Sequence, residues 1–101
     1  MKQQNTAVRI KIIGLPTAKV RLAVANANAS LSRCEPRPKI QWISDIQRIA
    51  SMGALVVPTV LVNDRLKAAG RVPSVYEFES WVGEEQQVRI PAEKAQEYYS
   101  H

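Results

Sequence analysis

The order of the predicted secondary structure elements indicates a single α/β domain with the arrangement βαβαββα. Two observations carry this prediction: four short segments have the apolar spacing of strands, and three segments between or after them have the spacing of helices. At 101 residues the chain is long enough for one small hydrophobic core and too short for two. Its content of 46% hydrophobic and 23% charged residues is ordinary for a globular domain.

The first strand and helix occupy the chain up to residue 33. Alternating apolar residues predict a strand over Val8–Ile13. The Gly-Leu-Pro sequence at 14–16 ends this strand, and Pro16 disfavours helical geometry in Leu15 just before it. Apolar residues then recur at helical spacing, so we expect an alanine-rich helix from Thr17 to about Arg33.

A second strand and a short helix follow two prolines between residues 34 and 38. Lys39–Ile43 has the composition of a strand. Asp45–Ser51 is expected to be a short helix, with Ser44 or Asp45 as its N-cap and Gly53 after its end.

The next segment predicts a hairpin. Val56–Val62 is a continuous run of mostly β-branched residues, typical of a strand covered on both faces. Because proline has no amide hydrogen for the sheet, Pro58 should stand at the first residue of this strand or before it. Asn63 and Asp64 both tolerate a positive φ and predict a two-residue turn into a fourth strand, Arg65–Ala69.

The last predicted helix has Pro73 in its first turn and ends near Gly83. Residues 84–101 begin with a polar stretch and include a further predicted helix over Pro91–Tyr99. We therefore divide the chain into a flexible N-terminus (1–7), one domain (8–83) and a C-terminal extension (84–101). The buried stripe of the last helix is expected to consist of Val75, Phe78, Trp81 and Val82.

Charge is distributed unevenly along the chain. Residues 1–71 contain twelve Lys or Arg and three Asp or Glu, a net charge of +9, whereas residues 72–101 contain two and six, a net charge of −4. A solvated surface accounts for this pattern. A nucleic-acid surface would interleave aromatic and basic residues. Trp42 is the only aromatic residue in the basic part, and its neighbours Ile40 and Ile43 place it in the core, so we expect no nucleic-acid partner.

The single cysteine limits both chemistry and location. Cys34 has no second cysteine with which to form an internal disulfide, so we expect a cytoplasmic protein and a partly buried apolar role for Cys34 itself. Cys34 and His101 are the only residues of their kinds, which argues against a metal centre and against a Cys-His or Ser-His nucleophile. We expect no cofactor. No run of apolar residues is long enough to cross a membrane and no secretory signal is visible.

Three short motifs of the sequence are informative in combination. They are the first strand with Gly14; IASMG at 49–53 followed by Val-Pro-Thr at 57–59; and VND at 62–64 leading to AGRVPS at 69–74. With the element order, they resemble the thioredoxin and glutaredoxin superfamily, closest to the small archaeal and bacterial redox-active disulfide proteins. The resemblance covers about residues 8–83 and implies a thioredoxin-like fold, in which a four-stranded mixed sheet is flanked by helices.

The resemblance also implies a site. In that family the proline that matches Pro58 is cis and faces two cysteines, forming a groove for thiol-containing or extended peptide substrates. The cysteines follow a glycine with the spacing Gly-x-x-Cys-x-x-Cys, which from Gly14 falls on Thr17 and Val20. A hydroxyl cannot form an exchangeable bond to sulfur, and Cys34 lies at the far end of the helix, about 25 Å away at 1.5 Å per residue. Disulfide exchange is therefore not expected at this site.

Three functional hypotheses remain. The first is a redox-inactive module that binds a protein partner, or a second copy of itself, through the groove beside Val57 and Pro58 or through the sheet and helices. The second is a protein that binds a glutathione-like thiol or a small anion, in which Thr17 and the first amides of the helix hold the ligand and Lys19 and Arg71 add charge. The simpler role of Thr17 is an N-cap. The third is residual oxidoreductase activity through Cys34, for which we expect no turnover.

Overall fold

The computed structural model of the protein describes residues 7–34, 36–53 and 56–87. One mixed sheet has the strand order β2-β1-β3-β4, in which β1 is parallel to β2 and antiparallel to β3, and β3 is antiparallel to β4. This arrangement confirms the α/β class and the four-stranded mixed sheet flanked by helices. The elements are β1 (Arg9–Ile13), α1 (Ala18–Ser30), the 3₁₀ helix η2 (Leu31–Arg33), β2 (Lys39–Ile43), α2 (Ile46–Ser51), β3 (Thr59–Val62), β4 (Arg65–Ala69) and α3 (Val75–Gln87).

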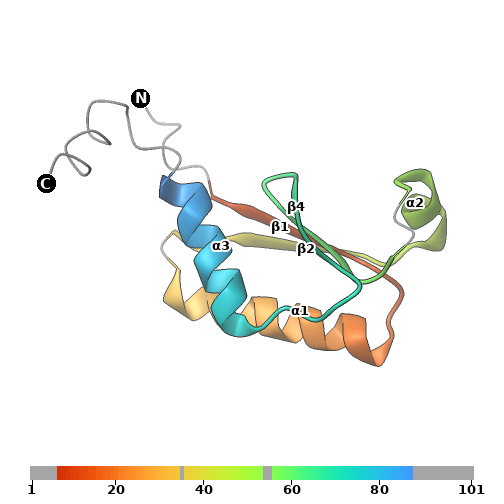
Figure 1. Ribbon diagram of the computed structural model, residues 1–101, viewed down its shortest axis with the longest axis horizontal. Coiled ribbons are helices and arrows are strands. Elements are labelled where there is room, and N and C mark those ends of the chain that lie inside the picture. Colours follow the sequence, from red (N-terminus) through yellow and green to blue (C-terminus); the bar gives the residue numbers. More distant parts are fainter. Residues whose placement is uncertain (1–6, 35, 54–55, 88–101) are drawn as a thin grey trace, which may run out of the picture.

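The main core lies between the sheet and the two long helices. α1 and α3 lie together on one face of the sheet (Figure 1). Trp42 packs against this core from β2, as the sequence predicts. The buried residues of this core are Val8, Ile10, Ile12, Val20, Ala23, Ala27, Cys34, Val60, Val62, Ala68, Phe78 and Val82.

The other face of the sheet is covered only in part. The short helix α2 stands at one end of the molecule (Figure 1). Its Ile49 packs against Ile13 and Ile43, with Leu61 partly buried beside them. Six residues of helix span about 9 Å, roughly half the length of a five-residue strand. The rest of this face is therefore not covered by α2.

The helix ends follow the chemistry of their capping residues. Thr17 and Asp45 have extended backbone angles and are the N-caps of α1 and α2, which settles the choice between Ser44 and Asp45. Gly53 follows α2 with a φ of 72°, a conformation in which a side chain is strained. α1 is shorter than predicted, because Leu31–Arg33 tighten into a 3₁₀ turn.

The prediction for β3 was too long and its burial was overstated. The strand begins at Thr59, immediately after Pro58, because proline cannot donate to the sheet. Val60 and Val62 are buried, whereas Thr59 and Leu61 on the other face are only half-buried. The run of β-branched residues therefore marks a strand with one covered face, whose first three predicted residues form a loop.

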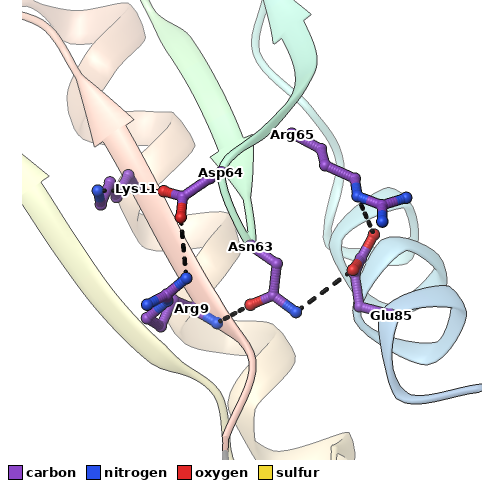
Figure 2. A network of polar contacts seen from close by, with 6 residues as sticks. All are labelled: Arg9, Lys11, Asn63, Asp64, Arg65 and Glu85. Carbon is purple, nitrogen blue, oxygen red and sulfur yellow. Dashed lines mark hydrogen bonds and ion pairs between the residues drawn. The ribbon is translucent and has the colours of Figure 1, made fainter. Parts of the chain in front are cut away.

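The turn between β3 and β4 is anchored by polar contacts. Asn63 and Asp64 have φ values of 51° and 66°, which confirms the predicted two-residue turn. Asn63 Oδ1 accepts a hydrogen bond from Arg9 N at 2.9 Å, and Asn63 Nδ2 donates to Glu85 Oε1 at 3.3 Å (Figure 2). Arg65 forms an ion pair with the same Glu85 across 3.9 Å. These contacts tie the hairpin to β1 and to the end of α3.

Two predictions about the ends of α3 were wrong. Pro73 lies before the helix, whose first turn is capped by Ser74: Ser74 Oγ accepts from Glu77 N at 3.1 Å, and Ser74 N donates to Glu77 Oε1 at 2.9 Å. The helix continues through Gly83 to Gln87, since packing of its neighbours outweighs the weak helix propensity of one glycine. The predicted N-terminal segment 1–7, except for Ala7, and the predicted helix at 91–99 lie outside the described residues.

Candidate functional site

The loop between β1 and α1 is held against β2. Gly14 N donates to Ile43 O at 3.0 Å, and Gly14 O accepts from Trp42 Nε1 at 2.9 Å. A third hydrogen bond, from Thr17 N to Leu15 O at 2.7 Å, closes the turn into the helix. The loop therefore presents the start of α1 in a fixed position at one end of the sheet.

Gly14 is packed so closely that it has no room for a side chain. A Cβ atom at this position would lie 2.6 Å from Val20 Cγ2 and 3.3 Å from Val57 Cβ. Both contacts are shorter than the usual approach between carbon atoms. Gly14 thus brings the first turn of α1 next to the loop before β3, although the two are almost forty residues apart in sequence.

Thr17 and Val20 occupy the two positions that the resemblance assigns to cysteines. Thr17 Oγ1 accepts from Val20 N at 3.3 Å, so its hydroxyl caps the helix, as the simpler hypothesis predicts. Val20 is fully buried in the core. One position therefore supplies a cap and the other an apolar contact, and neither supplies a thiol.

The loop before β3 forms the facing side of the site. The Val57–Pro58 peptide bond is cis. Pro58 is buried, and its carbonyl oxygen accepts from Gly70 N at 2.9 Å. Val57 is 39% exposed. Pro58 thus lies beneath the surface formed by Leu15, Thr17 and Val57, and we call that surface the proline edge.

The two basic residues of the predicted site lie in different environments. Lys19 is exposed in the first turn of α1 and has no ion pair within the described part of the chain. Arg71 Nη1 and Nη2 donate to Glu77 Oε1 and Oε2 at 2.9 and 2.8 Å. This bidentate contact lowers the pKa of Glu77 and raises the pKa of Arg71. The charge of Arg71 is thus largely satisfied by α3 rather than directed at the proline edge.

Cys34 lies at the other end of α1 and belongs to the core. It is 8% exposed. Burial raises the pKa of its thiol, and the nearby carboxylate of Glu79 raises it further. A thiol held in its protonated form is a poor nucleophile.

Neither a metal site nor a membrane span is found in the ranges that the structure describes. No three His, Cys, Asp or Glu side chains lie close enough together there to hold a metal ion. None of the described helices is both long and apolar enough to span a bilayer.

The comparison with protein families agrees with this geometry. A family model described as a thioredoxin domain matches residues 8–83, so the chain belongs to the thioredoxin-domain family. No curated protein matches the sequence.

Two contributions to the site were not predicted. Trp42 was assigned to the core, yet its indole nitrogen also fixes the loop at Gly14. Glu77 was not among the predicted site residues, yet its carboxylate pairs with Arg71, whereas Glu79 pairs with Arg33. The sequence Ser-Val-Tyr-Glu at 74–77 has the spacing of a capping box, and that spacing could have identified Glu77 as the capping residue in the first turn of α3.

Proposed function

We propose that this thioredoxin-domain protein does not exchange disulfides and instead binds a partner protein through the proline edge. The observation that supports this most strongly is the packing of Val20 and Val57 around Gly14. The space beside the proline loop is closed by apolar side chains, while the outer surface of the same loop stays open to solvent. The proline edge therefore keeps its shape and carries no reactive group.

The chemistry of the described residues supports the redox-inactive part of the proposal. Exchange requires a thiolate at one position and a second thiol to resolve the mixed disulfide. The N-terminus of α1 lowers the pKa of a thiol placed beside it, but Thr17 places a hydroxyl there. The raised pKa of Cys34 and its burial prevent it from replacing either thiol.

The exposed part of the proline edge supports the binding role. Leu15 and Val57 are 41% and 39% exposed. Because burial of apolar surface is favourable, a partner that covers these two side chains is stabilised in the complex. Pro16 and Thr17 are also exposed, so a partner can reach the turn that the hydrogen bond from Thr17 N to Leu15 O closes. A preformed, rigid surface loses little conformational entropy on binding.

A photoreactive amino acid placed at Val57 tests this proposal. In native extract we expect one partner protein, captured in stoichiometric amount, and the purified pair should bind at least about tenfold more weakly after Val57→Asp. The matched control places the same photoreactive group at Tyr76, which is exposed on α3 and is not part of the proline edge. A strictly monomeric mass together with no capture from position 57 would contradict the proposal.

A glutathione-like thiol or small anion is the second candidate, supported by one specific observation. The first turn of α1 contains no acidic residue, and Thr17 and Lys19 are both exposed there. This candidate predicts that millimolar glutathione raises the melting temperature of the wild type and leaves that of Thr17→Val unchanged. Flat calorimetry at millimolar glutathione would eliminate it.

We further propose that the protein works in the cytoplasm. Its 101 residues contain one cysteine, which is buried and free, so its stability does not draw on a disulfide.

A further inference from the structure

The sheet face opposite α1 and α3, which we call the open face, changes in character along the strands. Paired residues in neighbouring strands point to the same side of a sheet, so the register defines three rows across this face. The rows are Ile13, Ile43, Thr59 and Ala69 at the end near α2; Lys11, Gln41, Leu61 and Leu66 in the middle; and Arg9 and Lys39 at the far end. The open face is thus apolar at one end and basic at the other.

The apolar end contains a groove. Its volume is about 340 Å³, and most of its lining is apolar. Leu66, at one side of the groove, is 63% exposed, an unusually large exposure for a leucine in the sheet. The lining residues are Ile13, Met52, Gly53, Val56, Thr59, Leu61, Leu66 and Ala69.

The basic end is incompletely neutralised. Arg9 and Lys11 share one carboxylate, that of Asp64, at 2.9 and 3.2 Å (Figure 2). Lys39, which is beside Arg9 in the register, has no ion pair among the described residues. Among the described residues, three cations and one anion therefore leave this end with a positive charge that a partner carrying acidic groups would complement.

The composition of the face distinguishes between the occupants it could take. A second copy docked face to face, with its own basic end in register, would set like charges against each other. Single-stranded nucleic acid would stack on aromatic side chains, and none of the three rows contains one. A helix covers a half-apolar sheet face in the usual layered architecture, and here α2 leaves room for one.

We propose that the open face binds an amphipathic helix of a partner protein, with apolar residues in the groove beside Leu66 and acidic residues over Arg9, Lys11 and Lys39. This inference rests on the proposed function, because it names the kind of partner segment that the binding module takes. It places that segment on a different surface from the proline edge, so the two claims can fail separately.

A helical peptide of known sequence tests the inference on the full chain. The probe has about 14 residues, or about 21 Å, with leucines along one side and glutamates flanking them in an alanine-rich background. We expect binding by fluorescence anisotropy, with amide shifts in β3 and β4 by NMR. Leu66→Asp should weaken binding at least about tenfold, and Lys39→Glu about threefold with a smaller salt dependence.

The controls match each variant in chemistry. Leu22→Asp and Arg21→Glu make the same changes on the solvent side of α1 and should leave the affinity within about twofold. A peptide with lysine in place of glutamate should bind at least about tenfold more weakly, because its charge repels the basic end.

Several results would overturn the inference. Equal binding of both peptides, binding of neither, or shifts confined to the proline edge would contradict the proposed surface. Tighter binding to vesicles of anionic lipid than to the acidic peptide would assign the face to a membrane. A dimer dissociated by Leu66→Asp would assign it to a second copy, and shifts in residues 88–101 of the free Leu66→Asp variant would assign it to the chain's own last segment. Capture of a partner by the photoreactive group at position 57 tests the proline edge and does not test the open face.

Discussion

Gly14 lies where the first turn of α1 meets the loop before β3. Its missing side chain lets Val20 and Val57 approach it from two directions. A glycine in this position serves close approach rather than an unusual backbone angle, since its φ is not positive. The residue therefore determines how tightly the proline edge is assembled.

Replacing Gly14 with alanine should destabilise the fold by about 1–3 kcal/mol, because the new Cβ overlaps Val20 Cγ2. Val20→Ala should destabilise it by about 2 kcal/mol through the loss of buried methyl groups. In the Val20→Ala background the cost of Gly14→Ala should fall below about 1 kcal/mol, as measured by urea unfolding of the four proteins in the cycle.

Gly83 is the matched control for this prediction. It lies inside α3, and a Cβ added there meets no atom within 4 Å. Gly83→Ala should therefore stabilise the protein by about 0.5–1 kcal/mol through improved helix propensity. Equal effects of alanine at positions 14 and 83 on the free energy of unfolding would contradict the prediction that the close packing around Gly14 leaves no room for a side chain.

Single residues differ in how far the sequence predicts their roles. The capping role of Thr17 follows from local chemistry alone, and the structure confirms it. The partner of Arg71 depends on where the loop at 70–74 places the guanidinium relative to α3. The distance between Arg71 and α3 is set by the tertiary structure. The sequence therefore predicts that Arg71 adds charge to the candidate site, whereas in the structure Arg71 pairs with Glu77.

The start of α3 is fixed by a capping box and an ion pair. Ser74 and Glu77 satisfy each other's backbone amides, and Glu77 also binds Arg71. The pKa of Glu77 is lowered by these contacts, with the Arg71 side chain as the largest cause. The carboxylate form of Glu77 is therefore the one that stabilises the helix start.

Glu77→Gln should reduce stability at neutral pH by less than about 1 kcal/mol, because the ion pair is exposed and glutamine retains the cap. Since the folded-state pKa of Glu77 is lowered, its contribution is present above the ordinary value of 4.5 and is lost as pH falls through the folded-state value. Urea unfolding from pH 7 to pH 3 should show the two proteins converging in acid. A constant difference over that range would contradict the assignment.

Element types were more predictable than element boundaries. Each strand and α-helix in the described ranges was identified from apolar spacing, composition or capping residues, but β3 begins three residues later and α3 ends four residues later than predicted. Val56 and Val57 have the composition of a strand, yet the following proline cannot donate to the sheet. Gly83 has the composition of a helix end, yet Val82 and Glu85 are buried on either side of it.

Within the described residues, the whole molecule is a sheet with one face covered by α1 and α3 and an opposite face that α2 covers only in part. The sequence predicted the layers because the element order and three motifs resemble the thioredoxin superfamily, and that resemblance implies a four-stranded mixed sheet flanked by helices. It did not predict the open face, since the short length of α2 and the register of four strands must be known together. The proline edge and the open face are thus both properties of assembled elements.

The main proposal is that the proline edge is a thioredoxin-domain site in which Thr17 and Val20 replace the two cysteines, so that it does not exchange disulfides. Reduction of insulin by dithiothreitol, followed by turbidity, compares the wild type with a double variant, Thr17→Cys with Val20→Cys, and with Thr17→Cys alone. We predict that the wild type adds nothing to the uncatalysed rate and that the double variant accelerates it. The single variant should accelerate it less than the double variant does, because only dithiothreitol can resolve its mixed disulfide. Turnover by the wild type that Cys34→Ser abolishes would contradict the account, as would a folded double variant with no activity.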